Sequence, residues 1–115
     1  MHEMAIVNNL LNECEKIRLE NNAKRIVKVK VSIGRLSGIE EHYFKEAFKA
    51  FTECKDTGYY KTKLEVIPKE LKLKCKTCDK EFIQDKNEFR CIFCNSLNLQ
   101  ILSGEELLLE RIELE

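Results

Sequence analysis

The sequence lacks any apolar run near the ~18 residues that a membrane-spanning helix requires, and it lacks an excess of charge of either sign. Twenty basic residues stand against twenty acidic ones, which gives a formal net charge of zero. A neutral chain has no overall field that would draw in nucleic acid or an acidic membrane. We therefore expect no nucleic-acid or membrane partner, and we expect its actual partners to be recognised by local features.

The first residues also lack the basic cluster of a secretory signal peptide, because Glu3 stands where such a peptide would carry positive charge. This predicts a cytoplasmic protein. In that reducing compartment, six cysteines favour metal binding or redox chemistry over a disulfide framework. With 43% hydrophobic residues in a chain of 115, the sequence suits one compact domain with at most a small appendage.

Hydrophobic periodicity predicts a helix and then a strand in the first third of the chain. From Glu3 to about Asn21, apolar side chains recur at three- and four-residue steps, as on one face of a helix. That stripe comprises Val7, Leu10, Leu11, Cys14 and Ile17. Residues 25–34 then alternate as a half-buried strand. Its apolar side carries Val27, Val29, Val31 and Ile33.

A second helix is predicted after Ser37, which with Glu40 matches a capping box. Its apolar stripe comprises Phe44, Ala47, Phe48, Phe51 and Cys54, and Gly58 gives a stop signal. Cys14 and Cys54, each on such a stripe, are expected to be small core hydrophobes, whereas His42 is expected on a solvated face. A second strand follows, and we expect it to end at Pro68, the only proline.

The tail beyond Gly104 is again strand-like, with Leu107 and Leu109 in one phase and Ile112 and Leu114 in the other. A one-residue bulge near Glu110 would reconcile the phases and make the tail a third strand beside the first two. The predicted fold class is therefore α+β, with two helices packed on a three-stranded mixed or antiparallel sheet. Residues 1–69 and 103–115 would form this domain. Residues 70–102, rich in lysine and short of core-forming aliphatic residues, would be an insert held together by something else.

Four cysteines in that insert have the spacing of a zinc site. Cys75 and Cys78 form one C-x2-C pair, and Cys91 and Cys94 form a second pair after twelve intervening residues. Two such turns bring four thiolates around one tetrahedral Zn(II), and with every position filled by sulfur the zinc would be structural. The residues between the pairs are expected to form a hairpin. A thioredoxin-like redox pair and an iron–sulfur cluster are the alternatives, but the first needs a single pair and the second commonly has other spacings.

The amino terminus carries a second candidate site, centred on His2. The α-amine of Met1, the first amide nitrogens and the His2 imidazole can converge in one plane, an arrangement that Ni(II) or Cu(II) prefers. Glu3 adds a carboxylate that would offset the metal's charge, and the following helix N-terminus favours negative charge. An accidental terminal histidine is the plainer interpretation of the same residue.

Three features in combination resemble the HypA/HybF family of hydrogenase maturation factors, which are nickel metallochaperones. They are the start Met1-His2-Glu3 on an amphipathic helix, the segment VSIGRLSGIEEHYFKEAF, and the late pair of C-x2-C turns before a terminal strand. The resemblance spans essentially the whole chain. It implies a nickel carrier that works with a HypB-type GTPase to fill the large-subunit precursor of [NiFe]-hydrogenase, and that in some bacteria also serves urease maturation. It implies further that His2 binds nickel as cargo and that Cys75, Cys78, Cys91 and Cys94 bind zinc.

The chain departs from the family pattern in the second cysteine turn. Ile92 and Asn95 stand where the family commonly has proline and glycine, although asparagine tolerates a left-handed turn. Leu97 and Asn98 occupy the stretch where some relatives offer a further histidine, which leaves His2 and His42 as the imidazole donors.

The sequence shows no nucleophile–base constellation and no phosphate-cradling glycine loop. We therefore expect a carrier, not an enzyme, with GTP hydrolysed by a partner. The first alternative is a zinc-ribbon adaptor for nucleic acid or protein that uses Phe82, Phe89 and Phe93 as exposed aromatic rings. The second alternative is a thiol oxidoreductase.

Overall fold

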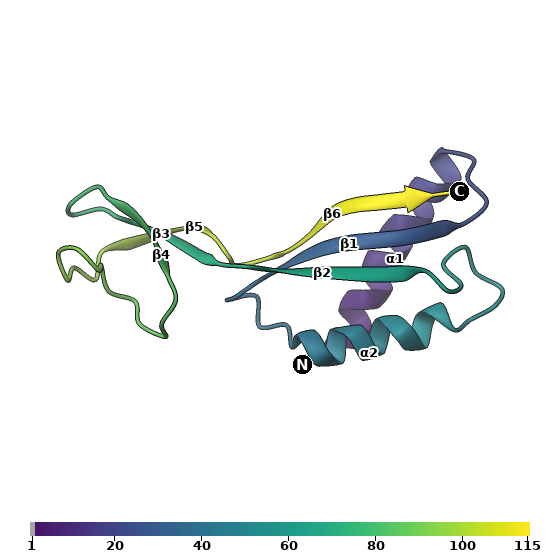
Figure 1. The fold of residues 1–115 in the computed structure, drawn as a ribbon, viewed down its shortest axis with the longest axis horizontal. Coiled ribbons are helices and arrows are strands. Elements are labelled where there is room, and N and C mark those ends of the chain that lie inside the picture. Colours follow the sequence, from purple (N-terminus) through teal and green to yellow (C-terminus); the bar gives the residue numbers. More distant parts are fainter. Residues whose placement is uncertain (1) are drawn as a thin grey trace. The chain divides into compact units, whose positions relative to one another are not determined.

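The computed structural model describes residues 2–115. Over that range the chain contains two helices, α1 (Glu3–Glu20) and α2 (Glu41–Thr52), and six strands. The strands are β1 (Ile26–Gly34), β2 (Lys63–Lys69), β3 (Leu71–Cys75), β4 (Glu81–Gln84), β5 (Leu99–Ser103) and β6 (Leu107–Leu114). They form two three-stranded sheets, in the orders β2-β1-β6 and β4-β3-β5 (Figure 1).

The chain divides into two compact units. The helical unit comprises the residues up to Ser32, Gly38–Ile67 and Leu108–Glu115, and the cysteine unit comprises Ile33–Ser37 and Pro68–Leu107. The predicted α+β class, with two helices, a three-stranded sheet and a separate four-cysteine segment, is confirmed. Neither of the two helices in the described range is long and apolar enough to cross a membrane.

The sheet of the helical unit is mixed, because β1 has a parallel neighbour on one side and an antiparallel neighbour on the other. The start of β1 lies at the start of β2, where the Thr62 hydroxyl donates to the Ile26 carbonyl at 2.6 Å. At the other edge, the amides of Lys24 and Gly34 donate to the carbonyls of Glu115 and Glu106. Since β1 and β2 are parallel, the segment between them must cross over, and α2 makes that crossover.

The core of the helical unit follows the predicted stripes of the two helices, whereas in β1 Ile26 is buried and Val27, predicted on the apolar side, is only half-buried. α1 contributes the buried residues Val7, Leu10, Leu11 and Cys14, α2 contributes Phe44, Ala47 and Phe48, and β1 contributes Ile26, Val29 and Val31. Figure 1 shows both helices running alongside the sheet, and they contact each other. The prediction that Cys14 packs as a small hydrophobe is confirmed, because its side chain is 0% exposed.

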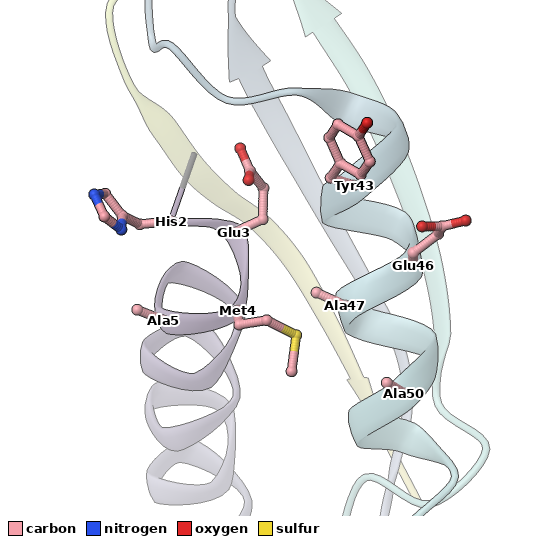
Figure 2. A pocket seen from close by; sticks show the side chains of 8 residues that line it. All are labelled: His2, Glu3, Met4, Ala5, Tyr43, Glu46, Ala47 and Ala50. Carbon is pink, nitrogen blue, oxygen red and sulfur yellow. The ribbon is translucent and has the colours of Figure 1, made fainter.

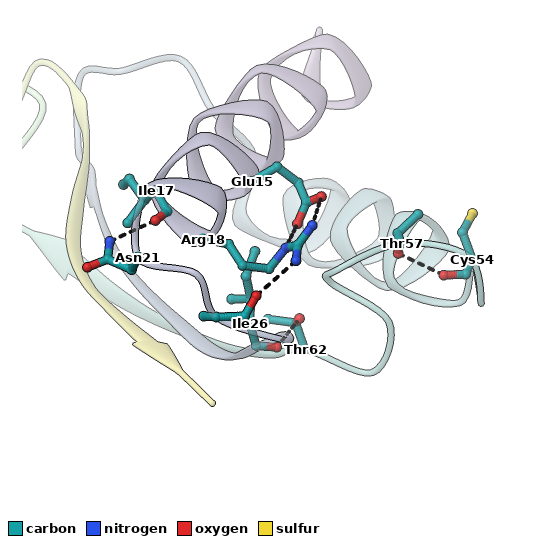
Figure 3. Close-up of polar contacts among 9 residues, drawn as sticks. Glu15, Ile17, Arg18, Asn21, Ile26, Cys54, Thr57 and Thr62 are labelled. Carbon is teal, nitrogen blue, oxygen red and sulfur yellow. Dashed lines mark hydrogen bonds and ion pairs between the residues drawn. The ribbon is translucent and has the colours of Figure 1, made fainter.

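The end of α1 is held by a polar cluster that the sequence patterns did not indicate (Figure 3). The Arg18 guanidinium donates to both carboxylate oxygens of Glu15, at 2.7 and 3.0 Å, and to the Ala23 carbonyl at 3.0 Å. A Cβ on the buried Gly58 would collide with the side chains of Arg18 and Glu15. Gly58 therefore lets the loop before β2 pack closely against this pair.

Three predictions about the middle of the chain are wrong in detail. The predicted capping box is absent, because α2 begins at Glu41 and the Glu40 side chain makes no capping hydrogen bond. Gly38 has a left-handed φ of 76°, so the helix cannot begin at Ser37. Cys54 lies beyond the end of α2 and is exposed rather than in the core. Pro68 lies within β2 instead of ending it, which is possible because β2 is an edge strand.

The tail forms the predicted third strand, β6, beside β1. Leu107 and Leu109 are half-buried, Glu110 and Arg111 are both exposed, and the residues from Ile112 to Leu114 are half-buried. The phase therefore changes at Glu110, whose carboxylate accepts a hydrogen bond from the Ser32 hydroxyl at 2.9 Å. A bulge at this position stays a prediction.

The cysteine unit has a small apolar core of its own, which corrects the expectation that residues 70–102 are too poor in aliphatic side chains to form one. The core consists of Leu71, Leu73, Cys75, Phe82 and Cys91, with Cys78, Leu99 and Ile101 packed against it. β3 is the central strand, antiparallel to both β4 and β5. The expected hairpin between the two cysteine pairs is also wrong, because that stretch supplies one strand, β4, which pairs back onto β3.

Gly34 and Arg35, part of the segment that carries the resemblance described above, belong to the cysteine unit. A Cβ on Gly34 would overlap the backbone carbonyl group of Gly104. The Arg35 guanidinium donates to the Gln84 carbonyl and, at 2.9 Å, to the Asn87 side-chain oxygen. The glycine thus permits close backbone approach, and Arg35 ties the end of β4 to this segment.

Candidate metal sites

The four cysteines predicted to bind zinc come together in the structure. Their Sγ atoms all lie within 4.8 Å of one another. The Cys75–Cys94 sulfurs are 3.5 Å apart, and the Cys78–Cys91 sulfurs are 3.7 Å apart. Zinc–sulfur bonds of ~2.3 Å in a tetrahedron place neighbouring sulfurs ~3.8 Å apart, so the cluster has the dimensions of a four-thiolate zinc site.

Both cysteine turns have the same backbone geometry, which aims each pair of sulfurs at one point. The Asp79 amide donates to the Cys75 carbonyl at 2.9 Å, and the Asn95 amide donates to the Cys91 carbonyl at 3.0 Å. Asp79 and Asn95 adopt left-handed conformations, with φ of 64° and 67°. The expectation that Asn95 can stand in for glycine in this turn is thus confirmed.

Backbone amides also point at the sulfurs. The Cys78 amide lies 3.5 Å from the Cys75 Sγ, and the amides of Phe93 and Cys94 lie 3.4 Å from the Cys91 Sγ. Such donors stabilise a thiolate over a thiol. The first sulfur of each turn is therefore prepared for a negative charge.

The pKa values of the four thiols split accordingly: the first thiol of each turn has a lowered pKa, and the last, Cys78 or Cys94, has a raised one. The Cys78 amide, acting against burial, lowers the pKa of Cys75 to about 6. Burial raises the pKa of Cys91, but the amides of Cys94 and Phe93 outweigh it and lower the value. The Ser96 amide lowers the pKa of Cys94, but burial and the three neighbouring sulfurs raise it to about 12. Adjacent thiolates repel one another, and a divalent cation between them removes that repulsion.

Two of the lysines around this cluster have carboxylate partners. Lys74 lies 3.3 Å from Asp79, and Lys72 lies 3.4 Å from Glu81. The Lys80 ammonium lies 4.8 Å from the centre of the Phe93 ring. Two lysines of this unit are thus paired with acidic side chains.

The amino-terminal residues lie at the start of α1, next to a groove between the two helices. Met1 lies outside the described residues. His2 is the exposed residue that precedes α1, and its carbonyl accepts the Ile6 amide at 3.0 Å. The groove has a volume of about 660 Å³. It is lined by His2, Glu3, Met4, Ala5, Tyr43, Glu46, Ala47 and Ala50 (Figure 2).

Glu3 has a structural partner that the sequence did not indicate. Its side chain is only 5% exposed, and its Oε2 accepts the Glu40 amide at 3.2 Å. This bond joins the start of α1 to the start of α2. The spacing from Ser37 had drawn attention to the Glu40 side chain, whereas it is the Glu40 backbone that acts here.

The remaining candidate residues, His42 and the three phenylalanines, do not form one cluster. His42 is exposed on α2, as predicted, with its Nε2 3.3 Å from the Glu46 Oε1. Of the three phenylalanines considered for an adaptor surface, Phe89 and Phe93 are exposed, but Phe82 is 6% exposed and packs edge-on against Phe93. Phe82 therefore belongs to the core of the cysteine unit.

Comparison with known proteins decides the family. The family model described as "Hydrogenase/urease nickel incorporation, metallochaperone, hypA" matches residues 1–114. The chain belongs to the HypA family. The resemblance stated from the sequence is thereby confirmed.

Relatives and solved structures agree with this assignment. A hydrogenase maturation factor HypA from Aquifex aeolicus is 44% identical over 115 residues, a match that covers all of this chain and 98% of the relative. One from Campylobacter jejuni is 39% identical, with 97% of each chain covered. The solution structure of the Ni metallochaperone HypA from Helicobacter pylori matches with a TM-score of 0.70 and 31% identity, covering 99% of this chain and 97% of that one.

Proposed function

We propose that this HypA-family protein carries Ni(II) at its amino terminus for [NiFe]-hydrogenase maturation and holds a structural Zn(II) at its four cysteines. The family assignment over residues 1–114 is the observation that carries the proposal. The donor chemistry supports it, because nitrogens at the terminus and sulfurs in the cysteine unit suit different metals. We assign the nickel function to residues 1–69 with 103–115, and the zinc function to residues 70–102.

At the terminus, the nickel ligands would be the His2 imidazole, the α-amine and the first amide nitrogens, with Met1 and Glu3 assisting. The first amides of an α-helix make none of its internal hydrogen bonds, so a metal that binds them and displaces their protons breaks no bond of the helix. His2 is exposed at that end of α1, so a partner could reach a bound ion. The buried Glu3 carboxylate would contribute negative charge without needing to coordinate.

In the cysteine unit, Cys75, Cys78, Cys91 and Cys94 would complete the zinc coordination by themselves. A four-thiolate site has no open position for water or substrate, so the zinc would stabilise the fold and take no part in a reaction. Zinc is therefore proposed as the resident metal and nickel as the cargo.

The proposed partners are a HypB-type GTPase and the large-subunit precursor of [NiFe]-hydrogenase, with urease maturation proteins in organisms that use both. The sequence has no phosphate-binding glycine loop, so a partner would supply GTP hydrolysis. We propose a cytoplasmic carrier without enzymatic activity of its own.

Isothermal titration with Ni(II) tests the terminal site. The zinc-loaded chain with its native terminus is compared with His2→Ala and with a chain extended before Met1, and a chain extended after Glu115 serves as the control. We expect tight binding only in the native and carboxy-terminally extended chains. Because an amine and an imidazole must both lose protons to bind, the affinity should fall as the pH is lowered.

Equal nickel affinity in all four proteins, with zinc content unchanged, would rule out the terminal site. In that case the zinc-ribbon adaptor becomes the better interpretation, because Ile92 and Phe93 are 58% and 53% exposed on the second cysteine turn. That alternative predicts a partner whose binding is lost in Phe93→Ala and is indifferent to nickel.

A further inference from the structure

The chain has only two histidines, and both lie at the same end of the helical unit. His2 directly precedes α1, and His42 is the second residue of α2. The two helix starts are joined by the hydrogen bond from the Glu40 amide to the Glu3 carboxylate, at 3.2 Å. The groove between the helices is lined by His2 on one side and by Glu46, the partner of His42, on the other.

We propose that His42 and Glu46 form a second, weaker Ni(II) site on α2, distinct from the amino-terminal site. The inference rests on the proposed nickel-carrier function and adds a second nickel-binding site to it. Residues four apart face the same side of a helix, and the His42 Nε2 lies 3.3 Å from the Glu46 Oε1. Metal bonds of ~2.1 Å at a right angle place two donor atoms ~3 Å apart, so a small adjustment lets both bind one ion.

The donors suit nickel and leave room for exchange. Imidazole nitrogen and carboxylate oxygen are both ligands of Ni(II). The side chains are 74% and 63% exposed, so water or a partner's ligand can occupy the other coordination positions. A site with two protein ligands and several exchangeable positions can accept and release an ion quickly, which a fully coordinated site cannot do.

The charges around the pair support binding of a cation. Lys45, on the same helix, lies 3.1 Å from Glu41, which offsets its charge. The Tyr43 ring, 5.4 Å from the His42 ring, is uncharged and also lines the groove. Figure 2 shows the His2 imidazole pointing away from α2, so His2 and the His42–Glu46 pair would hold separate ions.

The two sites should differ in magnetism. Ni(II) held by four nitrogens in a plane is diamagnetic, whereas Ni(II) held by one nitrogen, one carboxylate and water in an octahedron is paramagnetic. Because there are only two imidazoles, NMR of the histidine rings reads each site separately. Nickel at the terminus should shift the His2 signals without broadening, and nickel at the second site should broaden those of His42.

The experiment is a titration of the zinc-loaded full-length chain with Ni(II), followed through both histidine rings. We expect His2 to respond to the first equivalent and His42 to broaden with the next. Glu46→Gln should abolish the broadening, and His42→Ala should remove the second binding event in calorimetry. Glu53→Gln, which changes the net charge equally at the far end of α2 and leaves the Lys45–Glu41 pair intact, is the matched control and should leave the broadening in place.

Sharp His42 signals at nickel concentrations that saturate His2 would overturn the proposal and reduce His42–Glu46 to an ordinary surface ion pair. Equal loss of broadening in Glu46→Gln and Glu53→Gln would also overturn it, because the effect would then be only one of net charge. Broadening at His42 without any response at His2 would contradict the terminal site while supporting the second site. The two proposals can therefore fail independently.

Discussion

Truncation of Leu73 tests how the metal and the apolar core share the stability of the cysteine unit. Leu73 is 0% exposed on the central strand β3, two residues before Cys75. Leu→Ala in a core costs about 2–5 kcal/mol, depending on how far the surroundings collapse into the cavity. Here part of the lining is Cys75 and Cys91, which bound zinc would hold in place. We therefore expect a cost of about 4 kcal/mol, near the upper end of that range.

A cost of that size should not unfold the unit while zinc is bound. Structural zinc contributes about 10–16 kcal/mol in small zinc domains, which exceeds the loss from one leucine. The assay is amide hydrogen exchange of the zinc-loaded protein, in which about 4 kcal/mol corresponds to a roughly thousandfold faster exchange of β3 amides. Leu102→Ala, at a β5 residue that is 39% exposed, is the control and should change exchange little.

Two results would refute this reasoning. Equal effects of Leu73→Ala and Leu102→Ala would mean that the small core contributes nothing measurable. Loss of zinc from Leu73→Ala at neutral pH would mean that the core, not the metal, is the main support of the unit. Chelation of zinc from the wild-type chain should instead unprotect β3, β4 and β5 while the amides of α1 and α2 stay protected.

Three further predictions concern the helical unit and the thiols. Gly58→Ala should destabilise the protein by about 1 kcal/mol in urea unfolding, because the new methyl group displaces only the flexible ends of the Arg18 and Glu15 side chains; an unchanged midpoint would contradict the close approach. Iodoacetamide at pH 8 should modify exposed Cys54 but not Cys14, whose pKa is raised to about 11 by burial and by the neighbouring acidic residues, and mass spectrometry of the peptides checks this. Arg35→Ala should speed hydrogen exchange at the end of β4, where its guanidinium holds the Gln84 carbonyl, while Lys76→Ala should not.

Periodicity predicted the parts of the fold that depend on one repeating pattern. The stripe from Val7 to Cys14 and the alternation through Val29 and Val31 each place apolar side chains on a single buried face. The cysteine spacing predicted the sulfur cluster, because two short turns leave few other arrangements for four sulfurs.

The errors arose where one residue has two possible roles. Leu71 and Leu73 alternate with lysines, so composition alone concealed a strand that buries one side against Phe82. Cys54 continues the spacing of a helical stripe, but α2 ends at Thr52 and the chain turns away before reaching it.

Contacts between residues that are distant in the sequence could not be predicted from any local sequence pattern. The groove beside His2 depends on how α1 and α2 pack, and the Glu3–Glu40 bond uses a backbone amide that any residue at position 40 would supply. Likewise, Gly58 gave a helix stop signal, whereas its role is to make room for Arg18.

The pairing of β3 with β5 has a consequence for the order in which the protein assembles. In that pairing Lys72 lies opposite Ser103, so the chain leaves the cysteine unit close to the point where it entered. During synthesis this unit can fold and take up metal before β6 exists. Until then, one edge of β1 has no partner strand, and such an edge can pair with another chain.

Metal uptake therefore lowers the entropic cost of pairing β6 with β1. Closing an unstructured loop of some 35–40 residues costs roughly 3 kcal/mol of chain entropy from its length alone. If the cysteine unit is already folded, its two ends are already close together and this entropy has been lost before β6 pairs. Under the proposed function, a shortage of zinc should consequently affect not only β3, β4 and β5 but also β6, a strand without any cysteine, as fraying of the last strand and association of newly made chains through the open edge of β1.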